Sequence, residues 1–94
     1  MGVNTMRKVT YIQLDGQDLY KLRVFILNFS LQKMAECLDC SASLLCRIER
    51  GSLGLTPTMS MQVIELIKKK CGFNPEDTEE NFIKNYLLES ELRA

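Results

Sequence analysis

The sequence predicts an all-α domain of four to five helices. Apolar residues recur at spacings of three and four, capping residues stand where helices would begin, and asparagine and glycine stand where they would end. The length of 94 residues suits one compact domain, and a content of 46% hydrophobic and 26% charged residues is typical of a folded globular protein. A domain this small gains stability by burying apolar surface against a second copy, so we expect a homodimer.

Residues 1–15 are predicted to form an N-terminal arm or a short strand, because residues 9–14 (VTYIQL) are rich in β-branched and aromatic side chains. The first helix is predicted over residues 16–27, with Asp15 as its N-cap and Asn28 as a left-handed C-cap. Its apolar face comprises Leu19, Leu22, Phe25 and Ile26.

Two short helices are predicted next. Ser30 caps the second helix, which ends near Asp39. Ser41 begins the third helix, which ends at about Arg50, before a glycine suited to the C′ position at Gly51.

Two longer helices complete the predicted fold. Gly54 and Pro57 mark a loop, Thr58 is predicted to cap the fourth helix, and Lys68–Lys70 fall in its last turn, where cations suit the helix dipole. Pro75 is predicted to open the fifth helix. Acidic residues load its first turns: Glu76, Asp77, Glu79 and Glu80. Its apolar stripe comprises Phe82, Ile83, Tyr86 and Leu87. That stripe packs either within the monomer or in a dimer interface, which makes residues 74–94 an acidic C-terminal helix and a candidate dimerisation element.

Charges are segregated along the chain although the formal net charge is zero. Residues 1–73 carry ten basic and six acidic side chains, whereas residues 74–94 carry two basic and six acidic side chains. The body is therefore positive by four and the C-terminal end negative by four. A positive body favours contact with phosphate on one face, and the alternative is two solvated surfaces of chance composition.

No targeting signal is recognised in the sequence. The N-terminal MGVNTMRKVT lacks the apolar stretch of a secretion signal, no apolar run reaches bilayer length, and Met6 stands where a myristoylation signal needs serine or threonine. We therefore expect a cytoplasmic protein with no membrane partner and with reduced thiols at its four cysteines.

Residues 31–48 carry the pattern of buried positions that two helices joined by a tight turn require. Counted from Leu31, positions 4, 8, 10, 15 and 18 are apolar: Met34, Leu38, Cys40, Leu45 and Ile48. The fifth position is Ala35, where a small side chain lets the two helices cross closely. This pattern predicts a helix-turn-helix.

The segment SLQKMAECLDCSASLLCRIERG resembles the helix-turn-helix of the Cro/cI-type phage repressors, the XRE or lambda-repressor-like family. The likeness extends more loosely over residues 19–67, and its most specific part is the spacing of Ala35, Ile48-Glu49 and Gly51. It implies that residues 16–73 form a DNA-binding domain that binds operator DNA as a dimer. It also implies a regulator of transcription, most often a repressor, that is associated with the nucleoid when it is bound to DNA.

The resemblance also implies a structural ion pair between Arg23 and Glu49. Leu31 departs from the family pattern, because a phosphate-binding glutamine is usual there, and Asp39 stands where glycine usually makes the turn. Aspartate tolerates the left-handed conformation better than most residues, so the turn is preserved. The turn after the first helix is one residue longer than usual, and the loop after the third helix about two residues longer.

If the third helix enters the major groove of double-stranded DNA, four of its residues face the bases. They are Ser41, Ala42, Ser43 and Arg47. Arg47 can bond O6 and N7 of guanine together, a contact worth ~1–3 kcal/mol of discrimination. Ala42 can contact only a thymine methyl group and the serines discriminate little, so we expect DNA shape to contribute. Lys33 and Arg50 flank the groove and are predicted to bind phosphate.

Other classes of function find less support. Cys37 and Cys40 form a CxxC, but Cys40 is a core position while Cys37 and Cys46 point elsewhere, so we expect no metal. The chain has no histidine, no phosphate-binding glycine loop and no pair of nucleophile and base, so we expect neither an enzyme nor a cofactor. The serious alternative is a protein-interaction module on the same fold, such as an antitoxin, an antirepressor or a cofactor of a regulator. Neutral net charge, Leu31 and Leu44 favour it.

Overall fold

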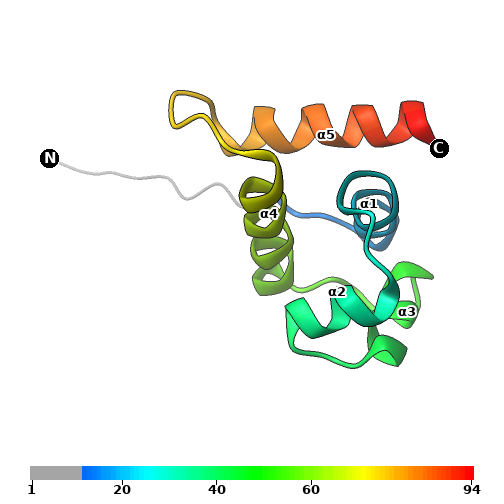
Figure 1. Ribbon diagram of the computed structural model, residues 1–94. Coiled ribbons are helices and arrows are strands. Elements are labelled where there is room, and N and C mark those ends of the chain that lie inside the picture. Colours follow the sequence, from blue (N-terminus) through cyan, green and yellow to red (C-terminus); the bar gives the residue numbers. More distant parts are fainter. Residues whose placement is uncertain (1–11) are drawn as a thin grey trace, which may run out of the picture.

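The computed structural model describes residues 12–94, and within this range it contains five α-helices, one π-helix and no strand (Figure 1). The predicted all-α class is confirmed. The predicted strand or arm over residues 1–15 lies largely outside the described residues, and residues 12–15 lead into the first helix without regular structure. Within residues 12–94, no helix is both long and apolar enough to cross a membrane.

The first predicted helix is one continuous coil with two kinds of hydrogen bonding. It runs as α1 (Gly16–Lys21) and then as a π-helix, η1 (Leu22–Leu27). Asp15 and Asp18 form a capping box at its start, and Asn28 ends it with φ 59°. The i→i+5 bonding of a π-helix widens the face turned to the core, and Arg23 is buried there beside three apolar neighbours.

The second and third helices follow the predicted caps closely. In α2 (Leu31–Leu38), Ser30 accepts a hydrogen bond from the backbone N–H of Lys33, and in α3 (Ala42–Glu49), Ser41 accepts one from the backbone N–H of Leu44. Asp39 takes the left-handed conformation with φ 56°, as expected of a residue that replaces glycine in the turn. The backbone N–H groups of Asp39 and Cys40 donate to carbonyl oxygens of α2, and the Ser41 cap holds the start of α3, so local hydrogen bonds fix both ends of the turn between α2 and α3.

The starts of the last two helices differ from prediction. The N-cap of α4 (Pro57–Cys71) is Thr56 rather than Thr58, because Pro57 occupies the first helical position, where its missing N–H costs nothing. The helix α5 (Glu79–Arg93) begins after Thr78 rather than at Pro75. Residues 74–77 form a turn instead, in which the Asp77 N–H donates to the Asn74 carbonyl.

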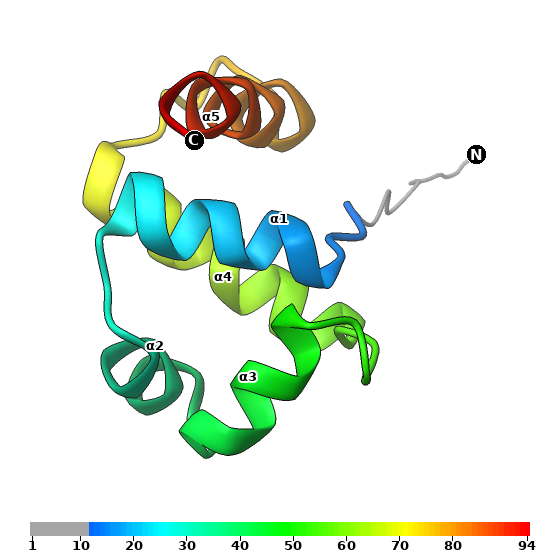
Figure 2. The same ribbon diagram turned by 90° about the vertical axis from the view of Figure 1, so that its right-hand side faces the viewer.

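The helices pack around one hydrophobic core with α1 and η1 at its centre. The helix α5 lies on one side of this coil, and α2 and α3 lie on the other (Figures 1 and 2). Phe82 and Ile83 are buried in this core, and Tyr86 and Leu87 pack half-buried against it. The apolar stripe of α5 therefore belongs to the monomer and is not a free dimerisation surface, and residues 74–94 share one core with residues 16–73.

The coil α1–η1 meets the end of α3 through a backbone contact at Gly16. A Cβ atom built on Gly16 would lie 2.0 Å from the carbonyl oxygen of Ile48. No side chain fits in that space, so Gly16 allows the two helices to approach.

We predict that Gly16→Ala lowers the free energy of unfolding by at least about 2 kcal/mol, because α1 must move away from α3 to admit the methyl group. Chemical denaturation measures the loss. Gly54→Ala is the matched control, since a Cβ on Gly54 meets nothing within 4 Å, and its stability should stay within about 1 kcal/mol of wild type. Equal stabilities of the two variants would contradict the close approach.

Candidate nucleic-acid interface

The helix α3 turns one face to the core and the opposite face to solvent. Leu45 and Ile48 are buried against the core, and they orient the helix so that Ser43 and Arg47, four residues apart, lie exposed on its outer side. Because α5 packs on the far side of α1 and η1, it does not cover this face (Figure 2). The outer side of α3 is therefore accessible along with the turn that precedes it.

Most residues predicted to contact DNA are exposed on or next to this face. Exposed residues are Lys33, Ser41, Ser43, Arg47 and Arg50. Ala42 differs, because it is half-buried and packs against the core. Ser41 has a structural task as well, since its Oγ accepts the capping hydrogen bond from the Leu44 N–H at 3.0 Å. Its hydroxyl proton can still donate to an acceptor outside the protein.

Basic side chains divide into two groups by whether they have a carboxylate partner. Five of those within residues 12–94 form ion pairs: Lys21 with Glu91, Arg23 with Glu49, Lys68 with Glu65 and Glu79, Lys84 with Glu80, and Arg93 with Glu89. The other five have no carboxylate partner among the described residues: Lys33, Arg47, Arg50, Lys69 and Lys70. All five of these lie on α2, on α3 and its C-cap, or in the last turn of α4. Among the described residues, basic side chains without a carboxylate partner thus lie on α2, α3 and the end of α4 rather than on α1, η1 or α5.

Lys69 and Lys70 are members of this group that the sequence did not predict as contacts. Their place in the last turn of a helix was explained by the helix dipole alone. The sequence KKKCGFN contains no acidic residue, and this could have indicated that some of its lysines are unpaired. That Lys68 is the one that pairs with Glu79 of α5 could be recognised only in the folded chain.

The predicted ion pair between Arg23 and Glu49 is present and is bidentate. Arg23 Nε donates to Glu49 Oε2 at 2.6 Å, and Nη2 donates to Oε1 at 2.9 Å. The side chains are only 10% and 8% exposed. A third donor, Nη1, bonds to the carbonyl oxygen of Phe29 at 2.9 Å. One guanidinium thus joins η1, the end of α3 and the segment that leads into α2.

The cysteines do not converge on a site. Cys37 is exposed, the other three are half-buried, and residues 12–94 contain no group of three or more histidine, cysteine or acidic side chains placed to hold a metal ion. Burial, and to a smaller extent the charge of Asp39, raises the pKa of the Cys40 thiol above its ordinary value. Cys40 is therefore a protonated side chain at neutral pH, packed against the core.

Comparison with known proteins returns no match: no protein-family model, no curated protein and no solved structure matches this chain. The residues of the α2–α3 segment and the geometry of their exposed face are therefore the features of this chain that indicate a function.

We predict that Glu49→Ala lowers the free energy of unfolding by about 3–5 kcal/mol, because it leaves the buried guanidinium of Arg23 without its counter-ion. Glu80→Ala is the control, since it breaks the exposed pair with Lys84 and should cost about 1 kcal/mol or less. Urea denaturation of both variants provides the measurement. Comparable losses in the two would show that the buried pair has no special structural role.

Proposed function

We propose that this chain is a sequence-specific DNA-binding regulator of transcription, a repressor of the helix-turn-helix type that places α3 in the major groove. The observation that carries the proposal is the outer face of α3, where Arg47 is exposed and has no carboxylate partner among the described residues. The resemblance of residues 30–51 to the Cro/cI-type repressors supports the same assignment. No catalytic step is part of it.

The shape of α3 suits the groove. The major groove is about 12 Å wide and admits one helix. Small side chains occupy the first positions of α3, Ala42 and Ser43, so the backbone can approach the base edges closely. Arg47 follows one turn after Ser43 and can reach further along the groove, where its planar fork bonds guanine.

Two cations beside α3 suit the DNA backbone. Lys33 on α2 and Arg50 at the C-cap of α3 are exposed, one on the helix before the one that would occupy the groove and one at that helix's end. Such contacts position a protein on the duplex without selecting its sequence. The capping serines and the Arg23–Glu49 pair make this arrangement rigid before DNA arrives, which reduces the entropic cost of binding.

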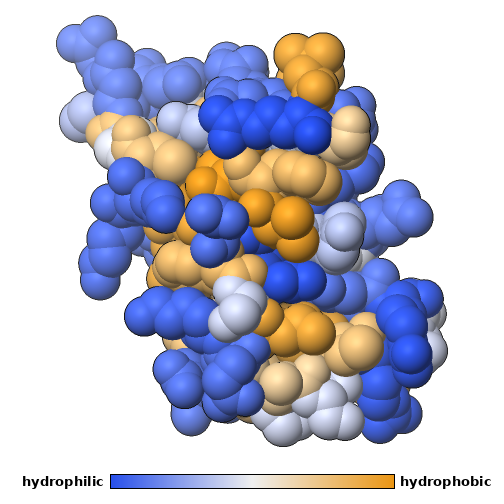
Figure 3. All heavy atoms as spheres, turned by 45° about the vertical axis from the view of Figure 1, so that its right-hand side comes forward, coloured by the Kyte–Doolittle hydropathy of each residue, from blue (hydrophilic) through white to orange (hydrophobic). Residues whose placement is uncertain are grey.

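A homodimer is part of the proposal, because an operator with two half-sites is bound by two copies one helical turn apart. Since Phe82 and Ile83 are buried in the monomer, the second copy must use other residues. Leu88 and Leu92 are the candidates, one turn apart on α5 and 61% and 88% exposed. In Figure 3 an apolar side chain protrudes at the upper edge of the molecule, where α5 lies.

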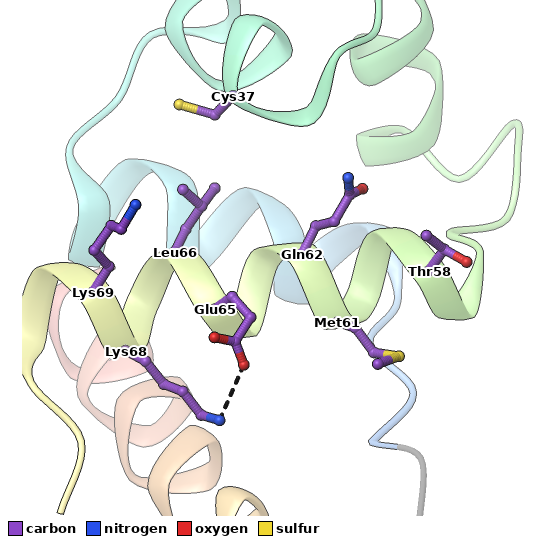
Figure 4. Close-up of a pocket in the computed structure, with 8 residues that line it drawn as sticks. All are labelled: Cys37, Thr58, Met61, Gln62, Glu65, Leu66, Lys68 and Lys69. Atoms are coloured by element: carbon purple, nitrogen blue, oxygen red, sulfur yellow. Dashed lines mark hydrogen bonds and ion pairs between the residues drawn. The ribbon is translucent and has the colours of Figure 1, made fainter.

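A protein-interaction module is the second candidate function, and a groove between α2 and α4 favours it. The groove has a volume of about 760 Å³ and is lined by Cys37 of α2 and by residues of α4 that include Met61 and Leu66 (Figure 4). Met61 is 54% exposed, and methionine adapts to varied apolar partners. Binding through this groove would respond little to salt, whereas phosphate contacts make affinity fall steeply as salt rises.

We predict that selection from random duplexes at near-physiological salt enriches one sequence with two half-sites, and that Arg47→Ala relaxes the preference at one base pair in each half-site. The expected loss at that base pair is ~1–3 kcal/mol, since one bidentate contact disappears. Lys84→Ala, on α5, is the control and should leave the selected sequence unchanged. An equal loss by Arg47→Ala on every sequence would refute the contact with bases, and failure of wild type to bind any duplex would favour the protein-interaction module.

A further inference from the structure

Two lysine side chains from different helices lie close to the ring of Phe29. The Lys33 Nζ of α2 is 5.7 Å from the ring centroid, and the Lys70 Nζ of α4 is 5.5 Å from it. Phe29 is half-buried, while both lysines are exposed. Two positive charges far apart in the sequence therefore share one aromatic surface. Phe29, Lys33 and Lys70 are called the Phe29 patch below.

Hydrogen bonds fix the position of this patch. Lys70 Nζ donates to the carbonyl oxygen of Leu27 at 2.8 Å, and Arg23 holds the carbonyl of Phe29 itself. Leu27 is the last residue of η1, so the ammonium group satisfies a carbonyl at a helix end, where a cation is favoured. An ammonium group has three donors, and this bond uses one of them. Lys70 can thus stay in place and still bind an external anion.

Negative charge within the fold does not compensate the patch. Lys33 and Lys70 have no carboxylate partner within residues 12–94. The nearest carboxylate along α2, that of Glu36, accepts a hydrogen bond from Gln32 at 3.4 Å. Lys69 adds a further charge on this side: in Figure 4 it points toward α2, whereas Lys68 turns away and bonds to Glu65. An anion from outside the chain would relieve the repulsion among these groups.

We infer that the Phe29 patch binds the phosphate backbone of the duplex, on the strand that flanks the groove occupied by α3. This inference depends on the proposed function, because it extends the DNA contact from α2 to the last turn of α4. Lys33 belongs to both surfaces, since it is exposed on α2 and also contacts Phe29. One DNA strand carries a negative charge for about every 3.4 Å of helix axis, so two ammonium groups near one ring can meet neighbouring phosphates of one strand.

The patch also accounts for a departure within the α2–α3 segment. Leu31, at the start of α2, stands where the resembling repressors usually have a phosphate-binding glutamine. A leucine cannot donate to phosphate, so the backbone contact on this side must come from neighbouring groups. Lys33 and Lys70 supply it beside Phe29, and they add affinity without adding sequence preference.

The test measures duplex affinity against salt for wild type, Lys33→Gln and Lys70→Gln on the sequence selected by wild type. Each variant should lower the slope of log affinity against log salt by about 0.9, with the preferred sequence unchanged. Lys70→Arg keeps both the charge and the donor to Leu27, and it should keep the wild-type slope. Lys84→Gln is a control on α5. All variants are assayed below their melting transitions, so that a loss of the Leu27 hydrogen bond does not enter the comparison.

Neutral methylphosphonates, introduced one phosphate at a time, locate the contact. Wild type should lose affinity at one or two flanking positions, and Lys33→Gln and Lys70→Gln should both become insensitive at the same or adjacent positions. Unchanged slopes, or insensitivity at unrelated positions, would overturn the inference while leaving the proposed function intact if Arg47→Ala still relaxes base preference. Absence of duplex binding by wild type would instead remove the proposed function itself and the inference with it.

Discussion

The arrangement of α2 and α3 depends on the buried guanidinium of Arg23. It binds the Glu49 carboxylate at the end of α3 and the Phe29 carbonyl before α2, so both helices are positioned relative to the same residue of η1. A buried charge requires such partners, because an unpaired one costs several kcal/mol. Few alternative packings offer a carboxylate and a carbonyl together, so this pair favours one orientation of α2 and α3.

The π-helical turn and Gly16 adapt the central coil to that constraint. In η1, Arg23 and its neighbours Leu22, Ile26 and Leu27 are buried together, so one coil serves the core and the ion pair at once. At the other end of the coil, Gly16 allows the backbone of α1 to approach the carbonyl of Ile48 in α3. Gly16 and Arg23 of the central coil thus both hold the C-terminal end of α3, whose outer face stays exposed.

The positions of the charged residues say more about phosphate binding than the net charge does. A formal net charge of zero argues against a phosphate-binding protein. The basic residues on α1, η1 and α5 are nevertheless paired with carboxylates, and Lys68 of α4 is paired with Glu79 of α5. The basic residues on α2, α3 and the end of α4 have no such partners within the described chain. Exposed cations without a carboxylate partner can act on DNA locally, because the paired charges elsewhere contribute little beyond a Debye length.

Local chemistry determined much of this fold from the sequence alone. Asp15, Ser30 and Ser41 cap helices within three residues of themselves, and Asn28 and Asp39 adopt the left-handed conformation their short polar side chains tolerate, so these features needed no partner elsewhere in the chain. The start of α4 differs from prediction because Pro57 takes the first helical position and leaves Thr56 as the cap. The start of α5 differs because Pro75 and Thr78 are both plausible at a helix start, and residues 74–77 form a turn instead. Only the tertiary structure decided that the stripe of α5 covers its own core, and that Lys33 and Lys70 approach the same ring, that of Phe29. Such contacts join residues distant in the sequence, and their geometry follows from how whole helices cross rather than from any nearby hydrogen bond.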